Sequence, residues 1–432
     1  MIEYILIGIT IFLLFLSIKK AGLIPFPTFF IVLLALSEII FTPTYYGHTT
    51  YDMVELFDYG GLTENFVLTL VIYTSIAVIS MISLVGKFSF LRNFKIDAKV
   101  IERLTKKKYF IFTVYAFFIL LSLHFLIFLS ISDWDLLWYN TEYLSPVVDQ
   151  RSLSLFGSVF TDTIARMTLL FAVLAPIGLY ASLNLKKSFL AYGFLFFCIF
   201  YFLLEFALHS RSAAVITILI ATLHYTMGRK FRRTIIFLLA ILSIFSLICA
   251  LESRNNEKHG FSSIPDTISD AFDHDVSDTS EMIITNFCQG IFSVAESLQV
   301  NDPFETRYKL LAFSPLPSFI DGYADILENQ AHRLHLYVPM PGIGEVFNFG
   351  WPFVSLLIAL YVTTIRLHSR LAATKPMLFL LCNFLIMFSL YHILTYPLRN
   401  GLRYLWFALF ITLIAGIPKL TTNRISTPRL YL

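Results

Sequence analysis

The sequence predicts an all-α integral membrane protein, and three observations support this fold class. Of the 432 residues, 57% are hydrophobic and only 14% are charged, whereas soluble domains carry about 25% charged residues. The apolar residues fall in long runs, and the basic residues are concentrated in alternate connections between those runs. These patterns exclude an ordinary soluble domain. The four cysteines are scattered and do not indicate a disulfide framework.

The apolar runs predict about eleven transmembrane helices. A hydrocarbon core of about 30 Å needs about 20 apolar residues in a helix. By this criterion the spans cover residues 2–18, 24–41, 66–85, 109–131, 160–183, 189–208, 211–227, 234–251, 347–366, 377–396 and 401–417. The seventh and eleventh runs are short, so the sequence defines their ends least well.

The basic residues predict the orientation of the chain, because Lys and Arg in short loops stay in the cytoplasm. Alternate connections are basic, beginning with Lys19-Lys20 and ending with the tail from Lys419. These segments hold 22 of the 32 Lys and Arg residues but only two acidic residues. The pattern places the N-terminus outside, the C-terminus in the cytoplasm and the long hydrophilic segment outside.

The hydrophilic segment divides the chain into three parts. Residues 1–251 form the first eight spans, residues 252–346 form a large extracytoplasmic loop, and residues 347–432 form the last three spans and a cytoplasmic tail. From Asp278 to Leu298 the apolar residues of the loop recur at helical spacing, which predicts a short amphipathic helix. We expect the loop to cover a site that faces outward. The alternative is a surface loop with one amphipathic helix.

The outer segments contain ten basic residues, of which eight are arginine. Arginine offers a planar fork of donors that matches phosphate oxygens two at a time, whereas lysine is a point charge. An outward-facing site rich in arginine therefore predicts an anionic ligand, most simply a phosphate or diphosphate. The candidate diphosphate-binding residues are Arg166, Arg211, Arg254, Arg333, Arg399 and Arg403.

Arg166 lies in a predicted span and Arg211 lies at the end of one, and a cation there costs about 2.5–3.5 kcal/mol unless it is paired or near the interface. Asp162 is close in sequence to Arg166, and Glu205 is close to Arg211. Structural ion pairs are therefore the alternative to ligand binding at these positions.

Two further arginines, Arg399 and Arg403, flank an Asn400-Gly401 pair that predicts a turn. They could hold one anion together or lie separately among lipid headgroups. The sequence leaves both interpretations open.

Three residues at the end of the loop could act as a general base, namely His332, His335 and Glu345. An imidazole titrates near neutral pH, and on a helix the two histidines would share a face. A metal-binding pair has no third ligand at a suitable spacing. Glu345 could instead orient a sugar hydroxyl. The alternative is that all three are solvated loop residues.

Three short motifs lie at the predicted outer surface, at the end of a span, within the loop and at the start of the ninth span. They are His209-Ser210-Arg211-Ser212-Ala213, Ser314-Pro315-Leu316-Pro317-Ser318 and Gly344-Glu345-Val346-Phe347-Asn348-Phe349-Gly350. With these motifs, the number of spans and the long outer loop in the second half, the chain resembles Wzy-type O-antigen polymerases. The O-antigen ligases share the layout, and the peptidoglycan polymerases that determine cell shape are more distantly similar in topology.

The resemblance implies a membrane-embedded glycosyltransferase of the GT-C type that needs neither metal, nucleotide nor cofactor. Such an enzyme polymerises undecaprenyl-diphosphate-linked oligosaccharide repeat units into O-antigen or capsule. It would lie in the cytoplasmic (inner) membrane as a multi-pass protein with its active site facing the periplasm. The implied partners are the lipid-linked donor and acceptor, membrane lipid and a chain-length regulator protein, and no nucleic acid.

The resemblance also implies roles for single residues. Arg211 matches the arginine at the outer end of a span, and Glu345, Asn348 and Gly350 match the start of the span after the loop. Arginines near the leaving diphosphate would stabilise its developing negative charge. A loop base would take the proton from the acceptor hydroxyl.

Two other functions remain alternatives to the polymerase. An O-antigen ligase would transfer finished glycan, and His332 or His335 corresponds loosely to the loop histidine of the ligases. A flippase or other transporter of lipid-linked oligosaccharide should carry polar residues at the bilayer midplane. Here the charged residues of the predicted spans cluster at their outer ends, which favours chemistry at the outer surface.

Overall fold

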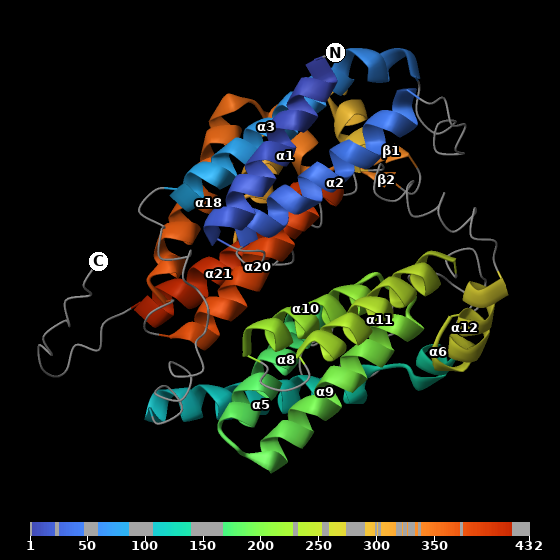
Figure 1. The fold of residues 1–432 in the computed structure, drawn as a ribbon, viewed down its shortest axis with the longest axis vertical. Helices are drawn as coiled ribbons and strands as arrows, with labels where there is room; N and C mark the ends of the chain where they lie inside the picture. Colours follow the sequence, from blue (N-terminus) through green and yellow to red (C-terminus); the bar gives the residue numbers. More distant parts are fainter. Residues whose placement is uncertain are drawn as a thin grey trace, which may run out of the picture.

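The computed structural model shows an almost entirely helical chain in two groups of helices (Figure 1). It describes residues 2–21, 26–46, 59–85, 107–139, 167–227, 232–252, 259–273, 290–298, 304–316, 333–335, 338–371 and 375–416, with residues 300, 322 and 326. Within these ranges the strands form one two-stranded sheet.

The first group contains the N-terminal and C-terminal helices. Its members are α1 (Ile2–Ala21), α2 (Phe26–Tyr46), α3 (Tyr59–Val85), α18 (Trp351–Ser369), α20 (Pro376–Thr395) and α21 (Leu398–Gly416). Helix α20 packs along α21, and α2 contacts α20, so the two ends of the chain share one core.

The second group contains the middle of the chain. Its members are α5 (Lys108–Ile131), α8 (Thr168–Asn184), α9 (Ser188–Ala207), α10 (Ser212–Met227) and α11 (Arg232–Glu252). Helix α8 packs against α9 and also contacts α20 of the first group. One large apolar cluster contains buried residues of both groups, and two smaller clusters contain further buried residues of the second group.

Helices occupy all eleven segments that the sequence predicts as spans. Among the described residues, seven helices are long and apolar enough to cross a membrane, and three more apolar helices are shorter. The remaining one, α21, carries two arginines near its start. The all-α, multi-pass membrane class is therefore confirmed.

Helix α5 illustrates how these helices suit a lipid environment. Phe110, Val114 and Leu121 are buried on one face at helical spacing. The opposite face exposes large apolar side chains, including Phe112, which is 73% exposed. His124 is buried, and its Nδ1 lies 2.6 Å from the hydroxyl of Tyr201. An apolar face on this scale is stable against lipid rather than water.

Short elements lie between the long helices in the chain, and those labelled in Figure 1 are on its right-hand side. They are α6 (Trp134–Trp138), η5 (Phe261–Ser263), α12 (Ile264–Asp273), α14 (Thr306–Ala312), β1 (Arg333–His335), β2 (Val338–Pro339) and α17 (Gly342–Phe349). Residues 290–297 are also helical, with Ile291 and Val294 buried as the predicted amphipathic pattern requires. The earlier part of that predicted helix lies outside the described residues. All but α6 and the last three residues of α17 belong to the predicted loop, which therefore carries short helices.

Two boundaries near the loop differ from the prediction. The ninth span was expected to begin at residue 347, but α17 ends at Phe349 and α18 begins at Trp351. The break lies at Gly350, whose φ of 99° suits glycine and interrupts the helix.

The Asn400-Gly401 pair is not a turn, because both residues lie inside α21. The chain turns earlier, at Tyr396, where the following proline disfavours helical geometry.

The end of the loop contains a short strand. Residues Arg333–His335 form β1, which pairs antiparallel with β2, so His335 does not lie on a helix, and His332 lies outside the described residues. Pro339 and Pro341 follow closely and oppose a helix at this point.

Candidate functional site

The nine predicted site residues fall into three groups. The structure describes the side chains of Arg211, Glu345, Arg399 and Arg403. Arg333 and His335 lie in β1, where only the backbone is described. Arg166, Arg254 and His332 lie outside the described residues.

Arg211 lies at the corner between α9 and α10, which residues 208–211 form. His209 has a left-handed backbone with φ of 50°, and the amide of Ser210 donates to the Glu205 carbonyl at 2.9 Å. This geometry reverses the chain and places Arg211 directly before the first turn of α10. A helix N-terminus carries partial positive charge. The corner therefore combines two positive features and attracts an anion.

The guanidinium of Arg211 is half-buried, and its Nε is buried without a hydrogen-bond partner among the described residues. The expected structural ion pair with Glu205 does not form in this part of the chain. Instead, the Glu205 carboxylate accepts a hydrogen bond from Thr168 Oγ1 at 3.0 Å. The hydroxyls of Ser210 and Ser212 also lie within hydrogen-bonding reach of Glu205. Arg211 is thus available to a ligand.

The start of α21 lies near this corner, although it is far away in sequence. Glu205 and Arg403 are both close enough for their charges to act on the Tyr404 hydroxyl. The Tyr404 ring packs against His392 with a centroid distance of 4.9 Å. Arg403 itself is exposed. The structure therefore places Arg403 and Glu205 near the same tyrosine, Tyr404, and Glu205 belongs to the last turn of the helix that precedes the Arg211 corner.

Glu345 lies in a different setting, in the interior between α17, α14 and α21. It is only 2% exposed. Its Oε1 accepts from the Tyr308 hydroxyl at 2.8 Å, and its Oε2 accepts from the Leu398 amide at 2.6 Å. Burial raises the pKa of Glu345 to about 7, although both hydrogen bonds oppose that rise. Such a pKa suits a general base, but both oxygens already hold protein donors.

The residues around Glu345 explain the glycines of its motif. A Cβ on Gly342 would lie 2.6 Å from the Leu398 Cα, and a Cβ on Gly344 would lie 1.9 Å from Ser297 Oγ. Asn348 Nδ2 donates to the Ser297 carbonyl at 2.8 Å. The motif therefore packs the loop helix of residues 290–297 and the start of α21 against α17.

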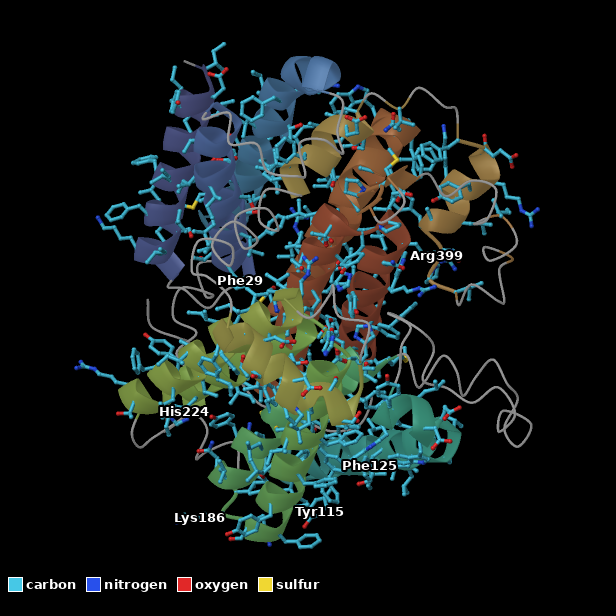
Figure 2. All side chains as sticks on the ribbon, turned by 90° about the vertical axis from the view of Figure 1, so that its right-hand side faces the viewer. Phe29, Tyr115, Phe125, Lys186, His224 and Arg399 are labelled. Carbon is cyan, nitrogen blue, oxygen red and sulfur yellow. The ribbon has the colours of Figure 1, made fainter. Side chains whose placement is uncertain are left out.

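Arg399 is 2% exposed and is held by α14. Its guanidinium donates to the carbonyl of Leu311, and to that of Leu316 at 2.7 Å. A cation at the C-terminal end of a helix is favoured by the helix dipole. Figure 2 shows Arg399 on the side of the C-terminal helices that faces the loop. Arg399 and Arg403 are therefore one helical turn apart but have different surroundings.

Sequence reasoning missed Thr168 and Tyr404. Thr168 had no recognisable motif, and Tyr404 was one of 22 tyrosines in the chain. Their proximity to Glu205 depends on contacts between helices that are distant in sequence.

No family model, no curated protein and no solved structure matches this chain. The class is defined by the fold: an all-α, multi-pass membrane protein with an arginine-bearing corner on the side of the large loop.

Proposed function

We propose that this protein is a membrane-embedded glycosyltransferase that polymerises undecaprenyl-diphosphate-linked oligosaccharide repeat units. The observation that carries the proposal is the α9–α10 corner. There Arg211 precedes a helix N-terminus and has a buried Nε without a hydrogen-bond partner among the described residues. The exposed Arg403 and the Glu205 of α9 both lie near Tyr404. Two arginines and a helix N-terminus suit a diphosphate.

In the proposed reaction the acceptor hydroxyl attacks the anomeric carbon of the donor sugar. The bond between that carbon and the diphosphate oxygen breaks, and the lipid diphosphate leaves with the electron pair. Arg211 and Arg403 stabilise the charge on the leaving group. The hydroxyl proton passes to a loop base, for which His332, His335 and Glu345 are the candidates.

We also propose eleven spans in a GT-C-like arrangement, with the N-terminus outside the cytoplasmic membrane and the C-terminus inside. Basic residues at one end of the helices support this orientation. Lys19 and Lys20 end α1, and Lys186-Lys187 join α8 to α9. Figure 2 shows Lys186 at the tip of its helical pair. Retention of basic loops in the cytoplasm then places the α9–α10 corner outside.

The test is reconstitution of the purified protein in proteoliposomes. The substrate is the lipid-linked glycan that accumulates in cells lacking the protein. The expected products are a ladder of longer lipid-linked glycans and released lipid diphosphate. Movement of the glycan across the bilayer without extension would identify a transporter. Transfer that requires a lipid A core acceptor would identify a ligase.

A further inference from the structure

A pair of buried histidines joins the large loop to the α9–α10 corner. Nδ1 of His259 lies 2.8 Å from Nδ1 of His209, and Nε2 of His209 lies 3.1 Å from Thr267 Oγ1. His209 is 2% exposed and His259 is 4% exposed. Thr267 belongs to α12. Both ring nitrogens of His209 therefore contact the loop, two residues before Arg211.

The loop segment of residues 259–273 is docked on the corner by further contacts. The Gly260 amide donates to the Ala207 carbonyl at 3.0 Å, and Ser262 Oγ donates to the Trp138 carbonyl at 2.7 Å. Ile264 and Ile268 pack on the apolar cluster that α9, α10 and α11 form beneath them. The histidine pair is thus the polar centre of a small interface.

His209 is also the residue of the corner whose backbone conformation is strained. Its φ of 50° is uncommon for a residue other than glycine, and such conformations persist when the surroundings fix them. The direction of the chain after His209 sets the position of Arg211. Contacts that hold the His209 ring therefore hold Arg211 as well.

The contact between the two rings depends on their protonation. In a hydrogen bond between two Nδ1 atoms, one nitrogen carries the proton and the other offers its lone pair. When both rings are imidazolium, both Nδ1 atoms carry protons, so the bond is lost and the charges repel. The docked arrangement therefore requires at least one neutral ring.

Burial lowers the pKa of His259, so the folded state favours its neutral form. The stability from this group is present above the ordinary histidine pKa of about 6.5 and is lost as the pH falls below it. The outward side of the membrane experiences such pH changes directly. The other charged side chains that the structure describes on α6, α9 and α12 and at the corner are Asp133 and Asp135 at α6, Glu205 on α9, Asp266 and Asp270 on α12, and Arg211 before α10; α11, which packs against α12, adds Arg233 at its start.

We propose that His259 is a positioning residue that holds the α9–α10 corner through His209, so that Arg211 faces the lipid diphosphate. Acid releases the corner when both rings become protonated. The identity of the ligand rests on the proposed function, whereas the docking of the loop does not.

The first test is hydrogen–deuterium exchange of the purified protein, with protection factors for the amides of Gly260 and Ser263. We expect wild-type protection to fall from about pH 7.5 to about pH 5, by about tenfold per pH unit for each additional proton that the opened state takes up. His259→Asn should keep its protection in acid, because the amide can bond His209 without titrating. His259→Ala should lose protection at both pH values.

The matched control is His224→Asn, which removes a buried histidine bonded to Tyr180 near the other end of α10 at 3.0 Å. This variant should keep the wild-type pH profile. A flat wild-type profile would overturn the proposal, and so would acid-induced loss of protection in His259→Asn that equals the wild-type loss.

The second test is glycan extension as a function of pH in the proteoliposome assay. His259→Asn should extend glycan at acidic pH where the wild type has lost activity. Equal loss of activity in both would show that His259 does not position Arg211. If the wild type extends no glycan at any pH, the proposed function fails, and the exchange experiment still decides whether the histidine pair docks the loop.

Discussion

The end of the loop around Glu345 and Arg399, here called the anchor, and the α9–α10 corner around Arg211 each contain predicted site residues at a helix end. The charged side chains of the two regions differ in their burial and in their hydrogen-bond partners. At the anchor, Glu345 and Arg399 are both 2% exposed and bond to partners within the protein. The Nε of Arg399 and the Nε of Arg211 are both buried without a hydrogen-bond partner among the described residues. The terminal nitrogens of Arg399 donate to two carbonyls, whereas no described residue accepts a hydrogen bond from the half-buried Arg211 side chain.

Arg399 and Glu345 are therefore used by the fold, whereas Arg211 keeps donors for the anionic ligand that we propose. A buried polar group without a partner costs about 1–3 kcal/mol, so binding of an anion at the corner would recover part of that cost. At the anchor, hydrogen bonds within the protein already hold the charges in place. The anchor fixes the start of α21 through Leu398 and Arg399, and α21 in turn carries Arg403 and Tyr404 to the corner.

The largest expected effect on the fold comes from breaking the anchor with Arg399→Met. This change leaves the carbonyls of Leu311 and Leu316 without their donor, at about 1–3 kcal/mol each. We expect a clearly lower melting temperature in detergent and reduced yield. The control is Arg403→Met, one turn along the same helix but exposed, which should melt like the wild type. Equal melting temperatures for Arg399→Met and Arg403→Met would show that the buried hydrogen bonds of Arg399 do not stabilise the fold.

Arg211→Ala should have the opposite profile, with an intact fold and lost activity. Removing a donor to a developing anion lowers the rate by about 100- to 1,000-fold. Arg211→Lys should recover part of the rate, because it keeps the charge but not the planar fork. The rate of glycan extension in proteoliposomes measures this effect, with the exposed Arg307→Ala as the control. Full-length polymer from Arg211→Ala would remove the corner from the mechanism.

The helical segments could be predicted because each depends on a local run of apolar residues near the length that a bilayer requires. The roles of Arg399 and Arg403 could not. The partner of Arg399, Leu311, lies 88 residues away on α14, and no periodicity near residue 400 indicates that contact.

The same reasoning applies to the motif around Glu345, which sequence inspection offered as a base or a sugar contact. Its two donors come from Tyr308 and Leu398, both distant in the chain. The break at Gly350 was missed for a different reason. A single residue with positive φ interrupts an otherwise continuous apolar run without changing its hydrophobicity.

Gly342→Ala would test how tightly the anchor is packed. The added Cβ would lie 2.6 Å from the Cα of Leu398 and 2.8 Å from its backbone nitrogen. Backbone atoms cannot move aside as a flexible side chain can, so we expect a loss of about 1–3 kcal/mol, seen as a lower melting temperature. The control is Gly8→Ala in α1, where a Cβ would meet nothing within 4 Å. Normal melting of Gly342→Ala would mean that α17 and α21 are not in close contact.

The smallest expected effect is a dependence of the stability of the fold on pH, which comes from the Glu345 carboxyl group. Its pKa in the fold is about 7, above the value of 4.5 for a free carboxyl. Its contribution to stability is therefore complete below about pH 4.5 and is lost as the pH rises through about 7. We expect the wild type to lose about 1 kcal/mol between about pH 6 and about pH 8. Glu345→Gln should flatten this loss in melting experiments.

The same variant decides whether Glu345 belongs to the anchor or to the chemistry. Glutamine keeps an oxygen that can accept from Tyr308 or Leu398 but cannot take up a proton from a substrate. If Glu345 only anchors, Glu345→Gln extends glycan at a rate close to the wild type. If Glu345 is the general base, the rate falls by about 100-fold or more while the fold stays intact. The general base would then lie at the anchor, and the anchor would take part in the reaction as well as in the fold.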